Sequence, residues 1–397
     1  MNPALPKIVL KKSHAERVRL WHPWIYRSQI KEAGSFPAPG SLVDIYSSSN
    51  RFIGIGYFNP KSEISVRILT REKGPIDKNF FKSRIEQAAR FRQRVVSQTN
   101  AFRLISSEAD GLPGLIVDRY AEILVVQFLT AGMEGLRSLV LDALEEVFPE
   151  LRGIYERSDS SSRRIEGLEE KTGWIRQDCG SDILVSERDV NYRVLFEKGQ
   201  KTGLYLDQRE NRLLLRDSGL KGEVLDAFCY TGGFGLHLAL AGCRVLGIDS
   251  QKEAIDQAEH NRELNHIPRE NLDFRVANVF DELRVFEKEK RRFDLVILDP
   301  PSFVKRKQEL QGAVAGYKEI ILRGMKLLNE GGWLAVFSCS YHVDENLLLQ
   351  IALSAASDVR KDLTLLRFMK QSSDHPIKPL VPETYYLKGF LLQISSL

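Results

Sequence analysis

One stretch decides the fold of this chain: Glu223-Val-Leu-Asp226-Ala-Phe-Cys-Tyr-Thr-Gly232-Gly233-Phe-Gly235. It reads as a short apolar strand that ends in a carboxylate, then a glycine-rich turn, then the start of a helix (LHLALAG). Glycines at such a turn let a ligand approach the backbone closely, and the helix start offers N–H groups. Beyond about residue 190, strands alternate with helices, which is typical of a doubly wound parallel sheet. The stretch therefore predicts an α/β domain with a ligand at this turn.

A second carboxylate ends the next expected strand, Arg244-Val-Leu-Gly-Ile-Asp249. An acid in this place accepts hydrogen bonds from the hydroxyls of an adenosine ribose. The dinucleotide fingerprint G-x-G-x-x-G is not met, because Leu238 stands where its last small residue belongs. Asp226 and Asp249 together favour an adenosine-bearing cofactor, although either alone could cap a helix. The following strand, 274–277, ends at Asn278, whose amide could meet an adenine edge; a turn or capping role is equally open.

The most informative stretch is Phe293-Asp-Leu-Val-Ile-Leu-Asp299-Pro300-Pro301-Ser302-Phe303. An apolar strand again ends in an acid, and the two prolines restrict the backbone and remove N–H donors. The carboxylate of Asp299 is therefore expected at the carboxyl edge of the sheet, where open α/β folds bind ligands.

A thiol follows the next apolar strand, in Trp333-Leu-Ala-Val-Phe-Ser-Cys339-Ser340. A lone cysteine is usually a small buried hydrophobe. Because Cys339 ends a strand beside the predicted reaction edge, a nucleophile is the favoured interpretation. Cys229 and Cys243 fall in the first strand–helix unit and are expected to pack in the core.

Composition restricts the class of protein. The 397 residues suggest two or three domains, and 43% hydrophobic and 28% charged residues are ordinary globular values. No apolar run could span a bilayer, the first residues lack a signal-peptide core, and the four cysteines form no C-x-x-C pair. These features predict a cytoplasmic protein with neither a membrane segment nor a structural metal. Residues 1–103 hold 19 Lys and Arg against 7 Asp and Glu, which suggests that one end meets a polyanion.

The N-terminal half reads differently from the C-terminal half. Period-two stretches at 41–46, 52–57 and 64–69 predict a small β-rich domain. A basic helix is expected over 80–96, with Phe81, Ile85, Ala88, Ala89 and Phe91 on its apolar face and Arg92 among the surface cations. A middle segment of about 100–185 mixes strands with a helix near 135–148, and the polar run 158–164 is predicted to be its loop.

The C-terminal motifs resemble an S-adenosylmethionine-dependent methyltransferase of class I. More narrowly, D-A-F-C-Y-T-G-G-F-G, I-D, A-N-V-F, D-P-P-S-F and S-C-S resemble the large-subunit ribosomal RNA methyltransferase I family, which makes 5-methylcytosine. The resemblance covers nearly the whole chain and includes 107–114, 201–209, 374–377 and 386–390. It implies a PUA-like RNA-binding domain at 1–72, a small α/β middle domain at 73–188 and a Rossmann-like methyltransferase domain at 189–397. One departure is Asn278, where an acid is commoner.

The resemblance also implies site residues, with Cys339 as nucleophile and Asp299 holding the base edge. S-adenosylmethionine would be held by Gln208, Arg209, Asp226, Phe228, Tyr230, Thr231, Gly232, Gly233, Asp249, Ser250, Asn278, Val279 and Asp299. The expected substrate contacts are Pro300, Pro301, Phe303, Lys305 and Arg306, and the expected partner is large-subunit ribosomal RNA. The short basic run 304–307 could guide phosphates to the site, and a solvated loop is equally open.

Several alternatives stay open from the sequence. A uracil-C5 RNA methyltransferase could use the same thiol, and a non-catalytic RNA-binding assembly factor could keep the fold. An NAD-dependent oxidoreductase would explain Asp249 but would leave Asp299 and Cys339 without a purpose. The target nucleotide, the base that removes the C5 proton and the oligomeric state, a homodimer included, are also open.

Overall fold

A computed structural model describes residues 5–12, 22–31, 36–180, 182–196, 203–304 and 309–396. The chain forms two compact units. Unit 1 comprises Met1–Ile183, Leu195–Gly203 and Ser373–Thr384, and unit 2 comprises Leu184–Val194, Leu204–Ser372 and Tyr385–Leu397. Among the helices described, none is long and apolar enough to cross a membrane.

The first sheet of unit 1 has the strand order β1-β3-β4-β5-β2. Its strands are β1 (Lys7–Val9), β2 (Trp24–Ile25), β3 (Leu42–Tyr46), β4 (Phe52–Phe58) and β5 (Val66–Thr70). The alternating residues Val43 and Ile45 of β3 are fully buried against Phe58 and Val66 in one apolar cluster. The period-two prediction for this region is thus confirmed within one or two residues.

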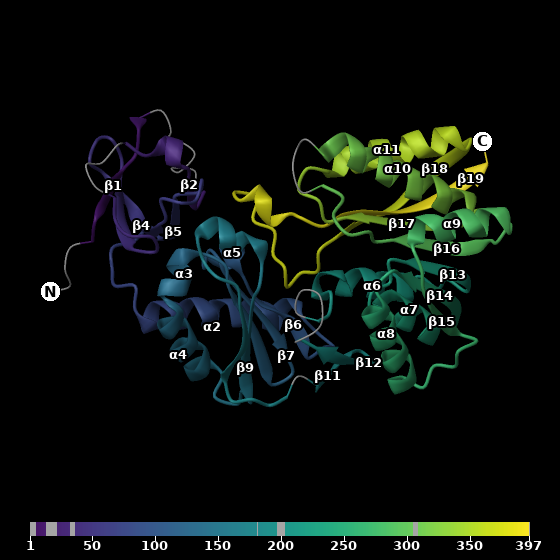
Figure 1. Ribbon diagram of the computed structural model, residues 1–397, viewed down its shortest axis with the longest axis horizontal. Helices are drawn as coiled ribbons and strands as arrows, with labels where there is room; N and C mark the ends of the chain where they lie inside the picture. The colour runs from purple at the N-terminus through teal and green to yellow at the C-terminus, as the bar shows by residue number, and fades with distance from the viewer. Residues whose placement is uncertain are drawn as a thin grey trace. The chain divides into compact units, whose positions relative to one another are not determined.

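The second sheet of unit 1 has the order β10-β9-β8-β7-β6 and packs against two long helices (Figure 1). Its elements are β6 (Ala101–Ser106), β7 (Leu115–Tyr120), β8 (Ile123–Phe128), β9 (Gly153–Ser158), β10 (Lys171–Arg176), α2 (Lys78–Val95), α3 (Ala131–Gly135), α4 (Arg137–Val147) and α5 (Ser161–Glu166). The predicted basic helix is α2, whose Phe81, Ile85 and Ala88 are buried.

Three predictions for unit 1 are wrong. Phe91 is 38% exposed, whereas Arg92 is buried, because the Arg92 guanidinium pairs with Asp110 and bonds the backbone oxygen of Arg103. The run 158–164 is not a loop: Ser158 ends β9, and Ser160 caps α5 by accepting the N–H of Ser162. Serine-rich polar runs serve as helix caps as readily as loops.

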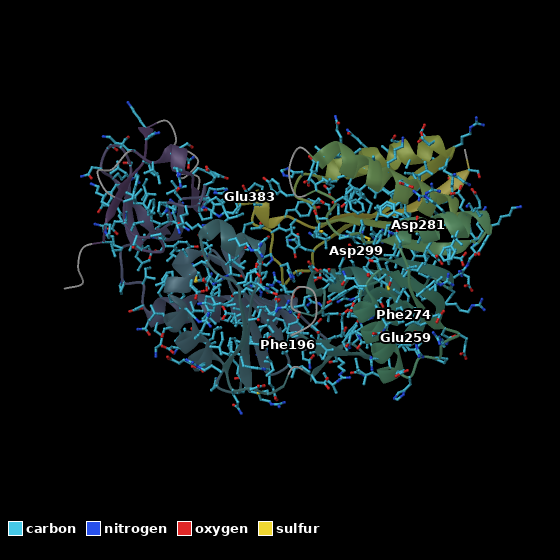
Figure 2. The ribbon with its side chains drawn as sticks, viewed as in Figure 1. Phe196, Glu259, Phe274, Asp281, Asp299 and Glu383 are labelled. Carbon is cyan, nitrogen blue, oxygen red and sulfur yellow. The ribbon has the colours of Figure 1, made fainter. Side chains whose placement is uncertain are left out.

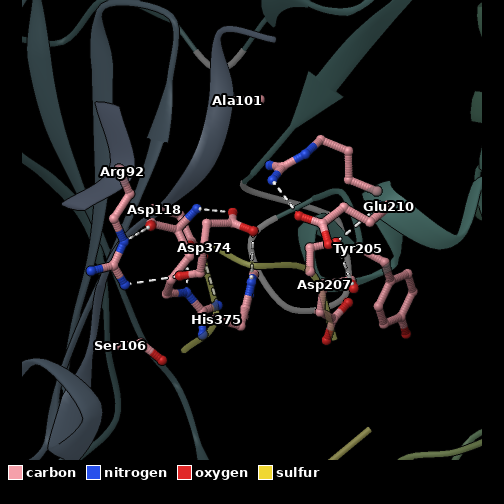
Figure 3. Close-up of polar contacts among 12 residues, drawn as sticks. Arg92, Ala101, Ser106, Asp118, Tyr205, Asp207, Glu210, Asp374 and His375 are labelled. Carbon is pink, nitrogen blue, oxygen red and sulfur yellow. Dashed lines mark hydrogen bonds and ion pairs between the residues drawn. The ribbon is translucent and has the colours of Figure 1, made fainter. Parts of the chain in front are cut away.

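A segment from the far end of the sequence completes unit 1. Residues Ser373–Thr384 leave the C-terminal sheet and lie against the middle of the chain. Arg92 Nη2 donates to the backbone oxygen of Asp374 at 2.8 Å, and the Asp374 carboxylate accepts the N–H of Arg103 at 2.8 Å (Figure 3). The chain therefore closes unit 1 with residues some 270 positions later in sequence.

Unit 2 contains a seven-stranded sheet of order β15-β14-β13-β16-β17-β19-β18. Strands β13 to β17 run parallel to one another, and β19 runs antiparallel to both β17 and β18. The strands are β13 (Gly222–Ala227), β14 (Cys243–Asp249), β15 (Leu272–Val276), β16 (Phe293–Leu298), β17 (Leu328–Ser338), β18 (Lys361–Lys370) and β19 (Lys388–Ser396). A hairpin of β11 (Asp182–Glu187) and β12 (Val190–Leu195) precedes it.

Helices cover both faces of this sheet (Figure 1). On one face lie α6 (Arg209–Arg216), α7 (Gly233–Leu240) and α8 (Lys252–Leu264), and on the other α9 (Val279–Lys288), α10 (Leu310–Lys326) and α11 (Glu345–Asp358). The doubly wound prediction is confirmed. Because β13, β16 and β17 are adjacent and parallel, the residues that follow them meet at one edge.

Candidate active site

Asp226 lies buried at the end of β13, and within the described part of the chain only one of its two carboxylate oxygens accepts a hydrogen bond. Oδ2 accepts the N–H of Gly235 at 3.1 Å, whereas Oδ1 is buried without a hydrogen-bond partner among the described residues. Burial raises the pKa of this carboxyl to about 7, and the negative charges of Asp299 and Asp249 add to the effect. A buried unpaired acceptor of this kind indicates a site for a donor that the chain does not supply.

The turn after Asp226 is held in an unusual backbone conformation. Phe228 and Tyr230 have positive φ angles of 65° and 50°, and Gly232 has a φ of 82°. A Cβ on Gly232 would lie 2.6 Å from the ring of Phe274, so no other residue fits without displacement. Backbone strain in non-glycine residues tends to occur at functional sites. Gly232 is therefore required by its positive φ and by the packing of Phe274 against it, and close approach of a ligand to the turn stays a prediction.

Asp249 ends β14 beside this turn. Its Oδ2 accepts the N–H of Tyr230 at 3.0 Å and its Oδ1 accepts the N–H of Gln251 at 2.9 Å. The carboxylate thus fixes the strained turn while keeping further lone pairs for a ligand. Asn278 caps α9 by accepting the N–H of Asp281, so the capping role left open by the sequence is present.

Asp299 follows β16 at the same edge of the sheet (Figure 2). Its Oδ2 accepts a hydrogen bond from Gln208 Nε2 at 2.9 Å, and Gln208 Oε1 in turn accepts from Asn211 Nδ2. Gln208 and Asn211 are both buried, so this chain fixes the orientation of the Asp299 carboxylate. The segment before β13 therefore contacts the Asp-Pro-Pro corner directly, a link that the sequence did not indicate.

The loop that carries Asp299 is tied to the loop that carries Cys339. The hydroxyls of Ser302 and Ser340 lie 2.9 Å apart, and the Tyr317 hydroxyl donates to Ser338 at 2.9 Å. Ser338, Ser340 and Tyr317 are almost completely buried, whereas Cys339 between the two serines is only half-buried. The thiol is therefore not packed into the core, while its neighbours are anchored there.

Three residues at this site were not singled out from the sequence. Burial raises the pKa of Tyr205 and of Tyr317, and the charges of Asp299 and Cys339 act in the same direction on both hydroxyls. Lys388, the first residue of β19, is 4% exposed and donates to the backbone oxygen of Ser340. A lysine within an otherwise apolar strand, KGFLLQ, is the signal that could have identified it.

The structure brings most of the predicted site residues to the carboxyl edge of the sheet. Those that follow or flank β13, β14 and β16 there are Asp226, Phe228, Tyr230, Thr231, Gly232, Gly233, Asp249, Ser250, Asp299, Pro300, Pro301 and Phe303. Arg209 is buried and lies next to Gln208 in the chain. The side chain of Val279 differs from the rest, because it is 3% exposed and packs in the central apolar cluster. Lys305 and Arg306 lie outside the described residues.

These residues fit an adenosine-bearing sulfonium cofactor with an amino-acid tail. The unpaired Asp226 oxygen suits the ammonium group of the tail, and the glycine turn at Gly232 leads directly into helix α7. Asp249 at the end of β14 stands where a ribose acceptor is wanted. The fold and this site define an S-adenosylmethionine-dependent methyltransferase.

Comparison with known proteins agrees with this class. A family model described as S-adenosylmethionine-dependent methyltransferase matches residues 168–391, and a PUA-like domain model matches residues 8–71. "Ribosomal RNA large subunit methyltransferase I" from Vibrio cholerae is 38% identical over 395 residues, covering 98% of this chain and 99% of the relative. The protein of the same name from Shewanella amazonensis is 38% identical with the same coverage. The chain belongs to the ribosomal RNA large subunit methyltransferase I family.

Solved structures share the fold along almost the whole chain. The crystal structure of SMU.776 complexed with SAH has a TM-score of 0.86 at 21% identity and covers 98% of this chain and 100% of its own. A second structure, from Streptococcus mutans, has a TM-score of 0.84 at 20% identity with the same coverage. At this level of identity the likeness concerns the fold alone.

Proposed function

We propose that this enzyme methylates C5 of a cytosine in large-subunit ribosomal RNA, with Cys339 as nucleophile. The names of its relatives support ribosomal RNA as the substrate class. The thiol at the carboxyl edge of the sheet supports carbon 5 as the methylated atom. Carbon 5 of a pyrimidine is a poor nucleophile until another group adds to C6. A half-buried thiol that follows a strand at the ligand edge is suited to this addition.

The chemistry follows from the two loops. Attack of the Cys339 thiolate on C6 forms a carbon–sulfur bond and moves the electron pair of the C5–C6 double bond towards C5. When bound, S-adenosylmethionine supplies an electrophilic methyl group for C5. The proton on C5 must then leave to a base, and the C5–C6 double bond re-forms as the sulfur departs with its electron pair. Cys339 is thereby regenerated and the reaction balances.

Asp299 is proposed to hold the base rather than to react with it. Its carboxylate is oriented by Gln208 and stands on a loop joined to the Cys339 loop. A carboxylate accepts hydrogen bonds from the exocyclic amine of cytosine, or, when protonated, donates to N3. Fixing the base edge in this way places C6 near the thiol, and orientation supplies much of the acceleration.

The target base must be unpaired or extruded from a helix to reach this edge. The basic N-terminal quarter, with 19 Lys and Arg against 7 Asp and Glu in residues 1–103, is proposed to supply most of the phosphate attraction. Pro300, Pro301 and Phe303 line the corner beyond Asp299, where the base would arrive.

One observation carries the proposal: the 2.9 Å contact between the Ser302 and Ser340 hydroxyls. It joins the corner that presents Asp299 to the loop that presents Cys339, although 38 residues separate the two serines. Neither a nucleoside-binding fold nor an RNA-binding factor requires a thiol and a carboxylate on two linked loops.

The test uses ribosomal RNA from cells that lack the protein. Incubation with the purified enzyme and S-adenosylmethionine, followed by nucleoside mass spectrometry, should reveal one new 5-methylcytidine that maps to the large subunit. Cys339→Ala should abolish the product while SAH binding, measured by calorimetry, stays within about twofold of the native value.

Other products would overturn specific parts of the proposal. A new 5-methyluridine would replace cytosine by uracil as the acceptor while keeping the thiol chemistry. No product at all, together with intact cofactor and RNA binding, would favour a non-catalytic assembly factor. A product that persists in Cys339→Ala would remove the nucleophile.

A further inference from the structure

Lys388 is an unusual residue because its ammonium group is buried. Its exposed fraction is 4%, and lysine is seldom buried to this extent unless a charge partner compensates for lost hydration. Lys388 is the first residue of β19 and pairs with Ser338 in the β17–β19 ladder. Ser338 is the residue directly before Cys339. The central sheet therefore fixes the lysine next to the strand end that carries the thiol.

The ammonium group of Lys388 contacts carbonyl oxygens and an aromatic ring. Nζ donates to the backbone oxygens of Ser340 and Tyr386, each at 3.2 Å, and lies 5.8 Å from the centre of the Tyr385 ring. Among the described residues, no aspartate or glutamate forms an ion pair with it. Two neutral carbonyls hold the group in place but do not neutralise it.

Among the groups whose negative charge acts on the ammonium group of Lys388, Cys339 acts most strongly when its thiol is ionised. Burial lowers the pKa of Lys388, and the charge of Cys339 opposes this more strongly than those of Asp344 and Glu345 do. Both carboxylates belong to the start of α11, and Glu345 is already engaged by the Tyr385 hydroxyl at 2.9 Å. The positive charge of Lys388 and the negative charge of an ionised Cys339 therefore attract each other at the C-terminal end of β17.

We propose that Lys388 is the positioning residue that keeps the Cys339 sulfur in its thiolate form for attack on the base. The inference rests on the proposed function, because it gives that nucleophile its activation. A sheet-anchored cation stabilises an adjacent thiolate without touching the substrate.

Other titratable groups lie at this edge of the sheet, and two of them, Tyr205 and Tyr317, interact electrostatically with Cys339. Tyr205 precedes α6, Tyr317 lies on α10 and Asp299 follows β16, and all three are neutral or negative when they titrate. A negative charge close to the thiol disfavours a thiolate, whereas Asp344 and Glu345 act on the ammonium group of Lys388. Lys388 is a buried cation that counters these negative charges.

The test measures the thiol directly and needs no RNA. The rate of Cys339 alkylation by iodoacetamide is followed across pH by peptide-resolved mass spectrometry, which separates it from Cys179, Cys229 and Cys243. In the native enzyme the midpoint should lie clearly below the ordinary thiol value of about 8.5. Lys388→Met should raise it by roughly 1–3 units, and Lys388→Arg should restore most of the shift.

Lys370→Met is the matched control, because Lys370 pairs with Lys388 in the β18–β19 ladder but is exposed. It should leave the midpoint unchanged. An unchanged midpoint in a folded Lys388→Met protein would overturn the inference, and so would a native midpoint at or above about 8.5, even if the variant did not fold. Methyl transfer by Cys339→Ala would instead overturn the proposed function, so the two failures are distinguishable.

Discussion

At the scale of single residues, the buried carboxyl of Asp226 predicts how the stability of the protein depends on pH. Its pKa of about 7 means that the folded ligand-free protein keeps a proton that the unfolded chain releases near pH 4. The folded state binds more protons in this window, so stability falls as pH rises from about 4 to about 7. The difference between the folded and unfolded pKa values of Asp226 corresponds to at most about 4 kcal/mol of folding stability.

Asp226→Asn tests this reasoning because the neutral amide mimics the protonated acid. Relative to the native protein, the variant should gain stability between pH 4 and pH 8, by up to about 4 kcal/mol in urea denaturation. Its affinity for SAH should fall at least about tenfold at pH 8, since the partner of the ligand ammonium is lost. An equal stability difference at both pH values would contradict the predicted titration.

At the scale of elements, the turn between β13 and α7 depends on glycine. Gly232→Ala should destabilise the protein by roughly 1–3 kcal/mol and weaken SAH binding, because a Cβ there meets the Phe274 ring and φ is positive. Gly312→Ala is the control on α10, where a Cβ meets nothing within 4 Å. It should stabilise by about 0.5–1 kcal/mol. Equal effects of the two variants in urea denaturation would show that the turn has no special shape.

Helix α6 is anchored by a buried ion pair. Arg212 bonds both oxygens of Glu187, at 2.9 and 2.6 Å, and also the backbone oxygen of Tyr205 at 2.9 Å. Arg212→Leu leaves the buried Glu187 carboxylate with His237, whose Nε2 lies 2.9 Å from it, in place of the permanently charged guanidinium, and should lower the free energy of unfolding by about 3 kcal/mol. The double variant with Glu187→Leu should recover a large part of that loss. A double variant no more stable than the single one would show that the loss does not come from the stranded charge.

At the scale of the whole molecule, the charge distribution predicts how RNA is bound. The N-terminal quarter carries a net +12, whereas the rest of the chain is acidic. Affinity for a large-subunit rRNA fragment should fall at least about tenfold between about 50 and 200 mM salt, because phosphate contacts release counterions. SAH affinity, measured in the same buffers, should change far less. Salt-independent RNA binding would remove the electrostatic role of this region.

The sequence predicted best those features that depend on local pattern. One rule predicted the positions of Asp226, Asp249, Asp299 and Cys339, namely that each lies at the end of an apolar strand or directly after it. The sheet order brings these strand ends together. Where a contact with a residue distant in sequence determines burial, the local pattern gave the wrong prediction. Arg92 is buried because Asp110 and the late residue Asp374 satisfy its guanidinium, which no helical periodicity encodes.

Lys388 was missed for the same reason. Its importance arises from strand pairing that places it opposite Ser338, 50 residues earlier, and from two carbonyls that hold its ammonium group. Similarly, nothing local in the run 373–384 indicates that it belongs to unit 1 rather than to the sheet on either side of it.

The most direct measurement of the central claim is covalent trapping. Large-subunit rRNA transcribed with 5-fluorocytidine cannot lose a proton from C5 after methyl transfer, so the carbon–sulfur bond should persist. With S-adenosylmethionine present, the account predicts an RNA–protein adduct whose cross-linked peptide contains Cys339, and no adduct with Cys339→Ala. Efficient methylation of ordinary rRNA without an adduct on fluorinated rRNA, or an adduct that maps to another residue, would contradict it.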